Sequence, residues 1–462
     1  MTGVMTEKAR SYPPRPGKST ASASIGPAGD EMRRRRHRPR NSKRSASGAL
    51  TVSSGGAHYR KSTFDAESAL SDHPLSNLEG EQADLLRQAS QALARQDARG
   101  ALALIDRADA LGPTHNGALN RSLALRLLGD FAGSLAQVDR ALSMQPYDFI
   151  ALLAKGALLE KLGKPKAAVA SYRNALKIAP TRDRCPPALL TQIDYASNLV
   201  QKHAEALRDH MKAEVEAVAA DLDPYTRERF DEGLEIYAGL KPTPKQEPIL
   251  LNYPRLPAIP FYDRALFPWL ETLEAGTDMI RAELEALIAV EFDRFAPYIN
   301  YPPEAPVNQW GALNHSHDWS ALFLWKDGQK QDEVCARCPG TMALLESLPM
   351  ADQPGFAPTV TFSALQPHTH IPPHTGSANI RLLCHLPLIL PGPARFRVGN
   401  TTREWKMGEA WVFDDTIEHE AWNDADALRV ILIIDVWNPF LAEGEKAMIT
   451  AMMQAQRRFM AD

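Results

Sequence analysis

A repeat of 33 to 34 residues between about residues 78 and 180 is the feature that most constrains the fold of this chain. Small and helix-breaking residues recur with this period in three registers: Pro113, Pro146 and Pro180; Gly129 and Gly163; Ala108, Ala141 and Ala175. A period of this length is typical of helical solenoids, in which each repeat buries its apolar face only against its neighbours. The glycines fall where paired helices would turn, a place that favours a residue without a Cβ atom.

Each repeat contains two amphipathic helical segments, and the pattern over residues 77–182 resembles about three tetratricopeptide (TPR) repeats. Repeats of this kind usually present a concave surface to a protein or a peptide, so we expect a TPR-mediated partner. A structural spacer or a dimerisation arm is an equal alternative, because no side chain in the repeats identifies a ligand.

The segment before the repeats, residues 1–76, differs in charge from the rest of the chain. Residues 1–62 contain 14 Lys and Arg against 3 Asp and Glu, whereas the whole chain has a formal net charge of −4. The segment is rich in Ser, Gly, Pro and Ala, so we expect disorder, because it cannot bury enough apolar surface to offset the ordering entropy. Its basic run, residues 33–44, could contact nucleic acid, an anionic surface or an acidic partner, and the alternative is a solvated tail.

A change of pattern marks a second domain that starts at about residue 241. Residues 183–240 read as a helical connector, with apolar residues three and four positions apart. Six prolines between Lys241 and Pro260 then exclude a continuous helix. After a helical stretch at 275–290, the segments predicted as strands are short, β-branched or aromatic, and bounded by turn residues: 359–367, 379–390, 394–400, 409–415 and 428–437.

Strands at this spacing predict a sandwich or a jelly-roll barrel over residues 241–440, followed by a helix within residues 441–462. The predicted fold class is therefore a multidomain α + β chain: a disordered basic tail, a TPR-like α-solenoid, and a double-stranded β-helix (jelly-roll, cupin-like) barrel with flanking helices. In the last helix, one side is formed by Met448, Met452, Ala455 and Phe459, which we expect to pack on the barrel or on a partner subunit.

Several classes of protein are excluded by what the sequence lacks. It has no run of about 18 apolar residues and no secretory signal, so we expect a cytoplasmic protein without a transmembrane segment. Four cysteines are too few for a disulfide framework in a chain of 462 residues. Cys335 and Cys338 form one CxxC pair without a second pair, which favours loop residues over a zinc or redox site.

Two histidines and an arginine form the constellation that carries chemistry. His374 is followed by His419 after 45 residues, and Arg429 follows after 10 more. This spacing suits a non-haem Fe(II) site that uses 2-oxoglutarate, because neutral imidazoles bind Fe(II) while open positions accept the oxoacid and O2. A guanidinium can pair bidentately with the distal carboxylate of the oxoacid. We expect the neighbouring His368 and His370 to shape the rim of the pocket.

The carboxylate of the usual facial triad is missing. Its position, two residues after His374, is occupied by Gly376. Either iron binding is lost, or water takes the place of the carboxylate. Asp414 and Asp415 precede His419 and could supply a carboxylate as a ligand or next to the ligands, and spacing alone does not decide between these roles.

Three segments carry a resemblance to a known family: PHTGSANIRLLCHLPLILP, GEAWVFDDTIEHEAWND and LRVILIIDVWNP. They resemble the aspartyl/asparaginyl β-hydroxylase family of Fe(II)/2-oxoglutarate dioxygenases, and the resemblance runs from about Leu256 to Pro439. This family characteristically binds iron through two histidines only, which accounts for Gly376. Its animal members also carry TPR repeats before the oxygenase domain.

The resemblance implies a role for each matching position. The iron ligands would be His374 and His419, and the distal carboxylate of 2-oxoglutarate would be held by Ser363 and Arg429. Its metal-proximal carboxylate would contact His385, Trp319 would line the cosubstrate side, and Arg381 would face either the cosubstrate or an acidic side chain of the substrate. Strand parity places Arg381, Leu383 and His385 on one face, which would let all three point into the barrel. Animal members have a second arginine where this chain has Leu383, so substrate recognition is expected to differ.

The sequence therefore predicts a dioxygenase that uses Fe(II), 2-oxoglutarate and O2 to hydroxylate the β-carbon of an Asp or Asn residue in a peptide or protein substrate, with His374, His419 and Arg429 as the catalytic set. The first alternative is the same chemistry on a lipid acyl chain or a free amino acid. The second is a TPR scaffold with an inactive barrel, which the intact set of site residues argues against.

Overall fold

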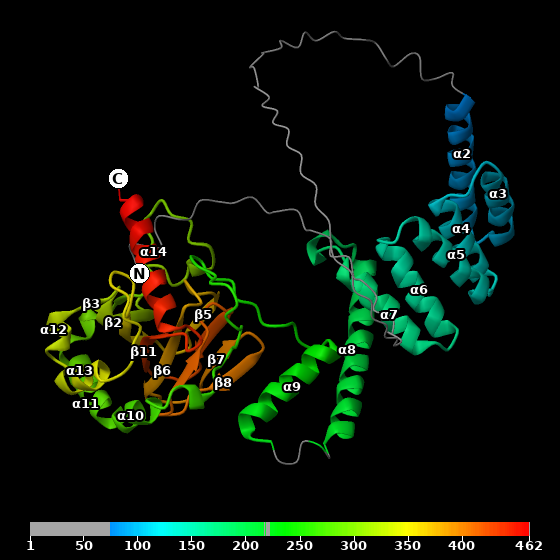
Figure 1. The fold of residues 1–462 in the computed structure, drawn as a ribbon. Coiled ribbons are helices and arrows are strands. Elements are labelled where there is room, and N and C mark those ends of the chain that lie inside the picture. Colours follow the sequence, from blue (N-terminus) through cyan, green and yellow to red (C-terminus); the bar gives the residue numbers. More distant parts are fainter. Residues whose placement is uncertain (1–73, 217, 219–221, 462) are drawn as a thin grey trace, which may run out of the picture. The chain divides into compact units, whose positions relative to one another are not determined.

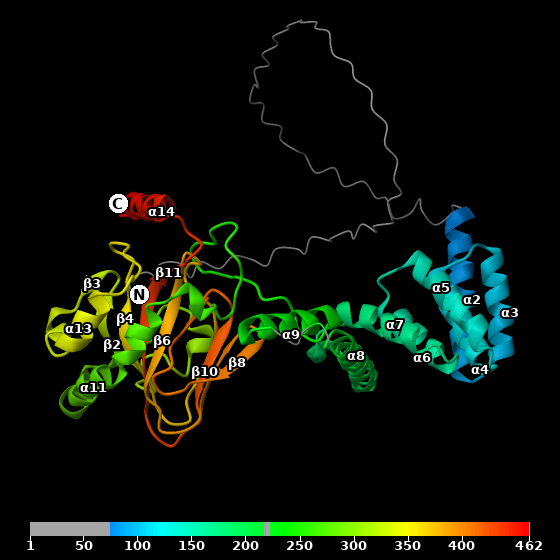
Figure 2. The ribbon, with the colours of Figure 1, turned by 60° about the horizontal axis from the view of Figure 1, so that its bottom comes forward.

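The computed structural model describes residues 74–216, 218 and 222–461. The predicted disordered tail, with its basic run at 33–44, lies almost wholly outside these residues; the first described helix begins at Pro74. Contacts divide the described chain into two compact units, a helical one over residues 74–203 and a mixed one over residues 204–461 (Figures 1 and 2).

The helical unit consists of consecutive helices that pack in pairs, as the TPR-like pattern predicts. They are α2 (Pro74–Ala94), α3 (Ala98–Ala110), α4 (His115–Leu127), α5 (Phe131–Met144), α6 (Phe149–Lys161) and α7 (Pro165–Lys177). Gln96, Gly129 and Gly163 occupy equivalent turns and have positive φ angles of 62°, 82° and 69°. The repeated glycines therefore lie where the backbone is left-handed, a conformation that Gly adopts without strain.

Burial and capping explain why the repeat sequence forms these helices. The repeated alanines, Ala108, Ala141 and Ala175, are all fully buried, so a larger side chain would push neighbouring helices apart. Asp97 and Asp130 cap α3 and α5, each accepting a hydrogen bond from the backbone N–H three residues ahead.

Two further helices follow in the predicted connector. A 3-10 turn (Arg182–Arg184) precedes α8 (Pro187–Val215), and α9 (Pro224–Ala238) comes after a stretch that is only partly described. Glu228 of α9 forms an ion pair of 2.8 Å with Arg403, which lies on a strand of the mixed unit. No helix in the described ranges is long and apolar enough to cross a bilayer.

The mixed unit contains two antiparallel sheets. One has seven strands in the order β1-β2-β4-β11-β6-β9, with β3 paired to β2: β1 (Ala296–Pro297), β2 (Trp319–Lys326), β3 (Gln329–Lys330), β4 (Val360–Leu365), β6 (Arg381–Ile389), β9 (Trp411–Phe413) and β11 (Arg429–Trp437). The other has four strands in the order β5-β10-β7-β8: β5 (His370–His374), β7 (Ala394–Val398), β8 (Thr401–Glu404) and β10 (His419–Asn423).

Each of the five predicted strand segments contains a strand, whereas the remaining strands were not predicted. The two sheets are separately hydrogen-bonded, and neither is closed in the part of the chain that the structure describes. The mixed helix and sheet architecture is therefore confirmed, and the jelly-roll barrel stays a prediction.

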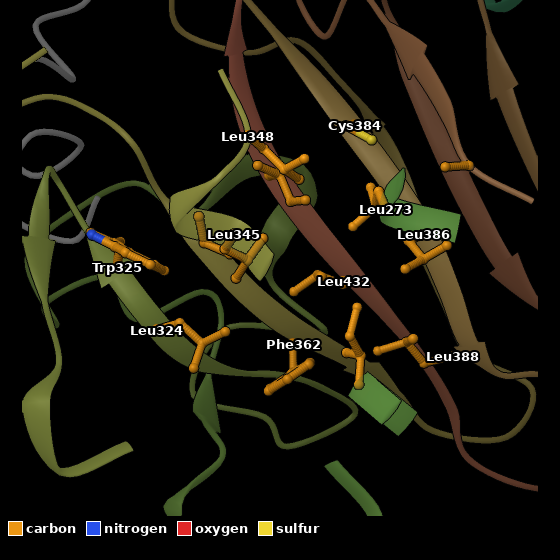
Figure 3. Packing of buried hydrophobic residues seen from close by; sticks show 14 of the residues in the cluster. Leu273, Leu324, Trp325, Leu345, Leu348, Phe362, Cys384, Leu386, Leu388 and Leu432 are labelled. Atoms are coloured by element: carbon orange, nitrogen blue, oxygen red, sulfur yellow. The ribbon is translucent and has the colours of Figure 1, made fainter. Parts of the chain in front are cut away.

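Helices cover the outer face of the seven-stranded sheet. They are α10 (Leu270–Ala275), α11 (Thr277–Glu291), α12 (Asp332–Cys335) and α13 (Pro339–Glu346), and 3-10 turns lie at Arg264–Leu266, Phe292–Arg294 and Asn308–Trp310. Even-numbered residues of β6 and β11, such as Leu386 and Leu432, pack against these helices in the main core (Figure 3). Odd-numbered residues of the same strands therefore face the other way, toward the four-stranded sheet.

A second core cluster joins the two sheets. It contains Trp319, Leu365 and Ile431 from the seven-stranded sheet together with Ile371 and Phe396 from the four-stranded sheet. The two sheets therefore face each other across an apolar interior, and the odd positions of the central strands point into it.

The C-terminal helix α14 (Glu443–Phe459) packs differently from the prediction. Its buried side consists of Ile449 and Met453, which contact Ala378 and Ile380. Met448 and Met452, predicted to pack on the barrel or a partner subunit, are exposed in the chain as described. Packing of this side on the barrel is therefore wrong, whereas packing on a partner subunit stays a prediction. Two apolar stripes run along this helix about 100° apart, and the other stripe is the buried one.

The CxxC pair also lies in a different environment from the predicted loop. Cys335 ends α12, and Cys338 precedes α13; both are buried in the main core. Burial raises the pKa of both thiols, that of Cys338 to about 12. Thiols that stay protonated are poor nucleophiles and poor metal ligands, so the pair contributes to packing.

Candidate active site

One cavity opens between the two sheets and gathers most of the predicted site residues. Six of them line it: Trp319, Ser363, His374, His385, His419 and Arg429. They come from β2, β4, β5, β6, β10 and β11, which are far apart in the sequence but meet through the pairing of the strands. His385 and Arg429 point inward because the odd-numbered residues of β6 and β11 face the four-stranded sheet.

His374 and His419 face each other at the edge where β5 pairs with β10. They are register partners in this pair, and their ring centroids lie 4.1 Å apart. Each ring is oriented by its own strand, because Nδ1–H of His374 donates to the carbonyl of Pro372 at 2.8 Å and Nδ1–H of His419 donates to that of Ile417 at 3.0 Å. A proton held on Nδ1 leaves Nε2 with a free lone pair, as a metal ligand requires.

Burial also keeps both imidazoles neutral. Desolvation lowers the pKa of His374 to about 4 and that of His419 well below its usual value. Neutral rings can bind a metal at physiological pH without first losing a proton. The described residues contain no group of three or more His, Cys, Asp or Glu side chains placed to hold a metal ion.

Arg429 is a buried cation that forms no ion pair with any residue that the structure describes. Its side chain is 1% exposed, and its Nε and Nη1 have no hydrogen-bond partner among the described residues. Its guanidinium carbon lies 4.7 Å from the ring centroid of Trp405, and burial lowers its pKa to about 9. An unpaired buried charge is costly, so this cavity wall is suited to an anionic ligand such as a carboxylate.

Polar groups that could accompany such a carboxylate lie on neighbouring strands. The Trp319 indole N–H donates to Oγ of Ser363 at 3.1 Å, and this fixes the hydroxyl at the cavity wall. His385 is buried against Phe413, with ring centroids 4.6 Å apart, and its Nδ1 has no partner in the described part of the chain. Burial, together with the charge of Arg429, lowers the pKa of His385 well below its usual value.

Arg381 does not reach the cavity, although the sequence places it on the same strand face as His385. Its guanidinium donates to the Phe356 carbonyl at 2.9 Å, to Oε1 of Gln353 at 3.3 Å and to Oγ of Ser377 at 3.2 Å. It is absent from the described residues that line the cavity. Arg381 is the first residue of β6, and its long side chain reaches acceptors beyond the strand, including Ser377, which itself lines the cavity.

The carboxylate of Asp415 fills the space beside Gly376. A Cβ atom added to Gly376 would lie 1.8 Å from Oδ2 of Asp415, and Asp415 lines the cavity. Burial and the neighbouring Asp414 raise the pKa of Asp415 well above its usual value. Asp414, in contrast, accepts hydrogen bonds from Thr416 and from the side chain of Gln246, so its carboxylate has a structural role.

The two other histidines of the cluster lie outside the cavity lining. His368 pairs with Asp426 at 2.8 Å, and its side chain is exposed. His370 donates to Glu420 at 2.8 Å and stacks on Trp422 with centroids 4.8 Å apart. Neither is among the described residues that line the cavity, so their expected role at the rim of the pocket stays a prediction.

Further cavity residues were not predicted from the sequence. Asp435 could have been found from the parity of β11, since it lies six residues after Arg429. Tyr298, Trp310 and Trp405 come from irregular segments or strand ends, where no period indicates direction. Tyr298 stacks on Trp319 with ring centroids 4.0 Å apart and helps to close that side of the cavity.

Comparison with known proteins places the mixed unit in a family. A model of the aspartyl/asparaginyl beta-hydroxylase family matches residues 274–439. An aspartyl/asparaginyl beta-hydroxylase of Mus musculus is 39% identical over 142 residues, which are 30% of this chain and 19% of that protein. An ornithine lipid ester-linked acyl 2-hydroxylase of Rhizobium tropici is 34% identical over 196 residues, which are 42% of this chain and 66% of that protein.

Among solved structures, an Arabidopsis OM64 TPR domain is 22% identical and covers 28% of this chain and 98% of that domain, with a TM-score of 0.24. The chain spans less than a fifth of the length of the mouse hydroxylase that it matches. The range matched by the family model contains both inward-facing histidines and Arg429. Residues 274–439 of this chain belong to the aspartyl/asparaginyl beta-hydroxylase family.

Proposed function

We propose that this protein is an Fe(II)- and 2-oxoglutarate-dependent dioxygenase, with its oxygenase domain within residues 241–440. The observation that carries the proposal is the meeting of two neutral imidazoles and one unpaired buried guanidinium in the same cavity. His374 and His419 would hold the ferrous ion through Nε2. When bound, the ion with 2-oxoglutarate and O2 supplies the oxidation of a C–H bond to an alcohol.

The chain's own residues would position the cosubstrate and exclude water. Arg429 would pair with the distal carboxylate of 2-oxoglutarate, and the Ser363 hydroxyl, held by Trp319, would donate a second hydrogen bond. His385 would contact the other carboxylate through its unpartnered Nδ1. The aromatic walls, including Tyr298 and Trp405, would keep bulk water from the reacting atoms.

By family membership, the first candidate for the reaction is hydroxylation of the β-carbon of an Asp or Asn residue in a peptide or a protein. In this proposal the TPR-like repeats offer a surface for the substrate protein or another partner. The mouse relative is named for this activity, but it shares only part of its length with this chain.

A second candidate, hydroxylation of an acyl chain, is supported by one position. Leu383 lines the cavity, where the family resemblance leads us to expect an arginine, so a polar anchor for an acidic side chain is replaced by an apolar group. Ile431 and Ile433 extend this apolar wall. The Rhizobium relative is named as an acyl hydroxylase.

Succinate release is the test of the oxygenase proposal. Purified protein with Fe(II), ascorbate and 2-oxoglutarate should release succinate, and Asp- or Asn-containing peptides or acyl lipids should increase the rate. Release that is unchanged in His374→Ala would contradict the proposal. Absence of both release and metal-dependent 2-oxoglutarate binding would favour the alternative of a TPR scaffold with an inactive domain.

A further inference from the structure

The cavity face of strand β11 changes charge from one end to the other. Its inward residues are, in order, Arg429, Ile431, Ile433 and Asp435, and all four line the cavity. Six residues of an extended strand span about 20 Å at about 3.3 Å per residue. A basic end and an acidic end are thus separated by two apolar side chains.

The acidic end contains two carboxylates and a hydroxyl. Asp435, Asp415 and Thr359 all line the cavity, with exposed fractions of 3%, 9% and 4%. One oxygen of Asp435 accepts the backbone N–H of Thr359 at 2.9 Å. Oγ1 of Thr359 is buried without a hydrogen-bond partner in the described ranges, and no other described residue donates a hydrogen bond to the Asp415 carboxylate.

The carboxylates at this end keep acceptor oxygens available. Arg381 is close enough to interact electrostatically with both carboxylates. However, its hydrogen bonds go to Gln353, Phe356 and Ser377, and no ion pair joins it to Asp415 or Asp435 among the described residues. The nearby guanidinium therefore does not use the acceptors that these two side chains present to the cavity.

We propose that Asp415, Asp435 and Thr359 form a subsite for a primary ammonium group of the substrate. An ammonium carries three N–H donors and no acceptor, which matches three acceptor side chains. Hydrogen bonds between a charged donor and a carboxylate are the strong ones in a buried site. Apolar Ile433 and Leu383 beside the subsite would contact the carbon chain that bears the amine.

The position of the subsite defines the orientation of the substrate. Arg429 is suited to an anion, so the carboxylates of the cosubstrate would occupy that end, and the amine of the substrate would lie at the other end. The orientation rests on the proposed function, whereas the subsite itself can be tested by binding alone. The shared ligand chemistry, an alkylammonium, occurs in the side chain of lysine and in amine-bearing lipid headgroups.

The binding test uses n-butylammonium as the probe and the full chain without metal or cosubstrate. We expect saturable binding of n-butylammonium, measured by ligand-observed NMR. The uncharged n-butanol, which has the same chain length, should bind more weakly by about tenfold or more. Asp435→Asn and Asp415→Asn should each weaken n-butylammonium binding by about tenfold. Asp424→Asn is the matched control, because this exposed carboxylate pairs with Arg395 outside the cavity lining.

Thr359→Val is a second variant, which keeps the hydrogen bond from the backbone N–H to Asp435. It should also weaken n-butylammonium binding, so the proposal can be tested even if Asp435→Asn does not fold. Equal binding of n-butylammonium and n-butanol would overturn the proposal. So would an unchanged dissociation constant in folded Asp415→Asn and Thr359→Val proteins.

A turnover arm distinguishes the source of the amine. A lysine-containing peptide, an amine-bearing acyl lipid and the N-acetylated form of each would be compared by stimulation of succinate release. Stimulation of succinate release by a free amine, but not by its acetylated form, would support the subsite. The compound that stimulates would show whether the substrate is a lysine-containing peptide or an amine-bearing lipid. Stimulation that is unaffected by acetylation would overturn it. Failure of all succinate release, with butylammonium binding intact, would count against the oxygenase proposal alone.

Discussion

His374 and His419 lie directly opposite each other on β5 and β10, and each donates its Nδ1 proton to the carbonyl two residues before it. The two strands thus orient both Nε2 atoms toward the same cavity. Replacing either ring by Ala should weaken binding of Fe(II), or of a stable substitute such as Mn(II), by more than about 100-fold, because a ligand is lost outright rather than reoriented.

Calorimetric titration of the metal into the apo protein would measure this loss. His370→Ala is the matched control, because that histidine stacks on Trp422 outside the cavity lining and should leave metal affinity unchanged. Equal affinity of the wild type and His374→Ala would show that the metal lies elsewhere.

Arg429→Met should have opposite effects on folding and on ligand binding. Removing an unpaired buried charge should leave the apo protein equally stable or more stable, by up to about 4 kcal/mol in the free energy of unfolding. The same change should weaken 2-oxoglutarate binding by about 2–5 kcal/mol, since the distal carboxylate loses its partner. Urea denaturation and anaerobic 2-oxoglutarate titration measure the two effects, with exposed Arg395→Met as the control.

The buried histidines should destabilise the metal-free protein on acidification. The pKa of His374 is lowered to about 4, and those of His419 and His385 are also lowered, so the unfolded chain binds protons near pH 6.5 that these folded-state rings do not accept. Their contribution to the free energy of unfolding should therefore decrease as the pH falls from about 6.5 toward 4, whereas the raised pKa of buried Asp415 acts in the opposite direction.

Urea denaturation at a series of pH values would measure this slope. His374→Asn should make the slope shallower, whereas His368→Asn, which replaces an exposed ring, should not. An identical slope in His374→Asn and the wild type would contradict the neutral state of this buried ring.

Gly376→Ala should disturb the Asp415 carboxylate rather than the histidines. The added Cβ would lie 1.8 Å from Oδ2 of Asp415, so the carboxylate must move, at a cost of about 1–3 kcal/mol in the free energy of unfolding. In the Asp415→Ala background the cost should largely disappear, because the obstructing atoms are gone. A double-mutant cycle measured by thermal unfolding would reveal this coupling, and additive effects would argue against the contact.

The repeats and much of the site were accessible from sequence because their residues obey a period. The 33- to 34-residue spacing identified the buried alanines and left-handed glycines, and the alternation along β6 placed His385 on the inward face. Segments without a periodic pattern were not predicted correctly. The β5 segment His-Ile-Pro-Pro-His has too few β-branched residues to indicate a strand, yet it pairs with β10.

Arg381 shows a different limit of sequence reasoning. Parity gave the correct strand face but not the course of a long side chain, which is determined by acceptors on Gln353, Phe356 and Ser377, remote in sequence or irregular in structure. The carboxylate of Asp415 beside Gly376 likewise depends on a contact between two loops. Neither contact can be predicted from the local composition or from the spacing of residues.

Along the central strands, residues that pack on the helices alternate with residues that line the cavity, so the two sets can change independently in evolution. On β6, Leu382 and Cys384 pack against the helices, whereas the intervening Leu383 faces the cavity. Exchange at such an inward position can alter what the protein accepts while the packing that holds the sheet to its helices stays intact. Substitutions at the inward-facing positions of the strands can in this way adapt one fold to chemically different substrates.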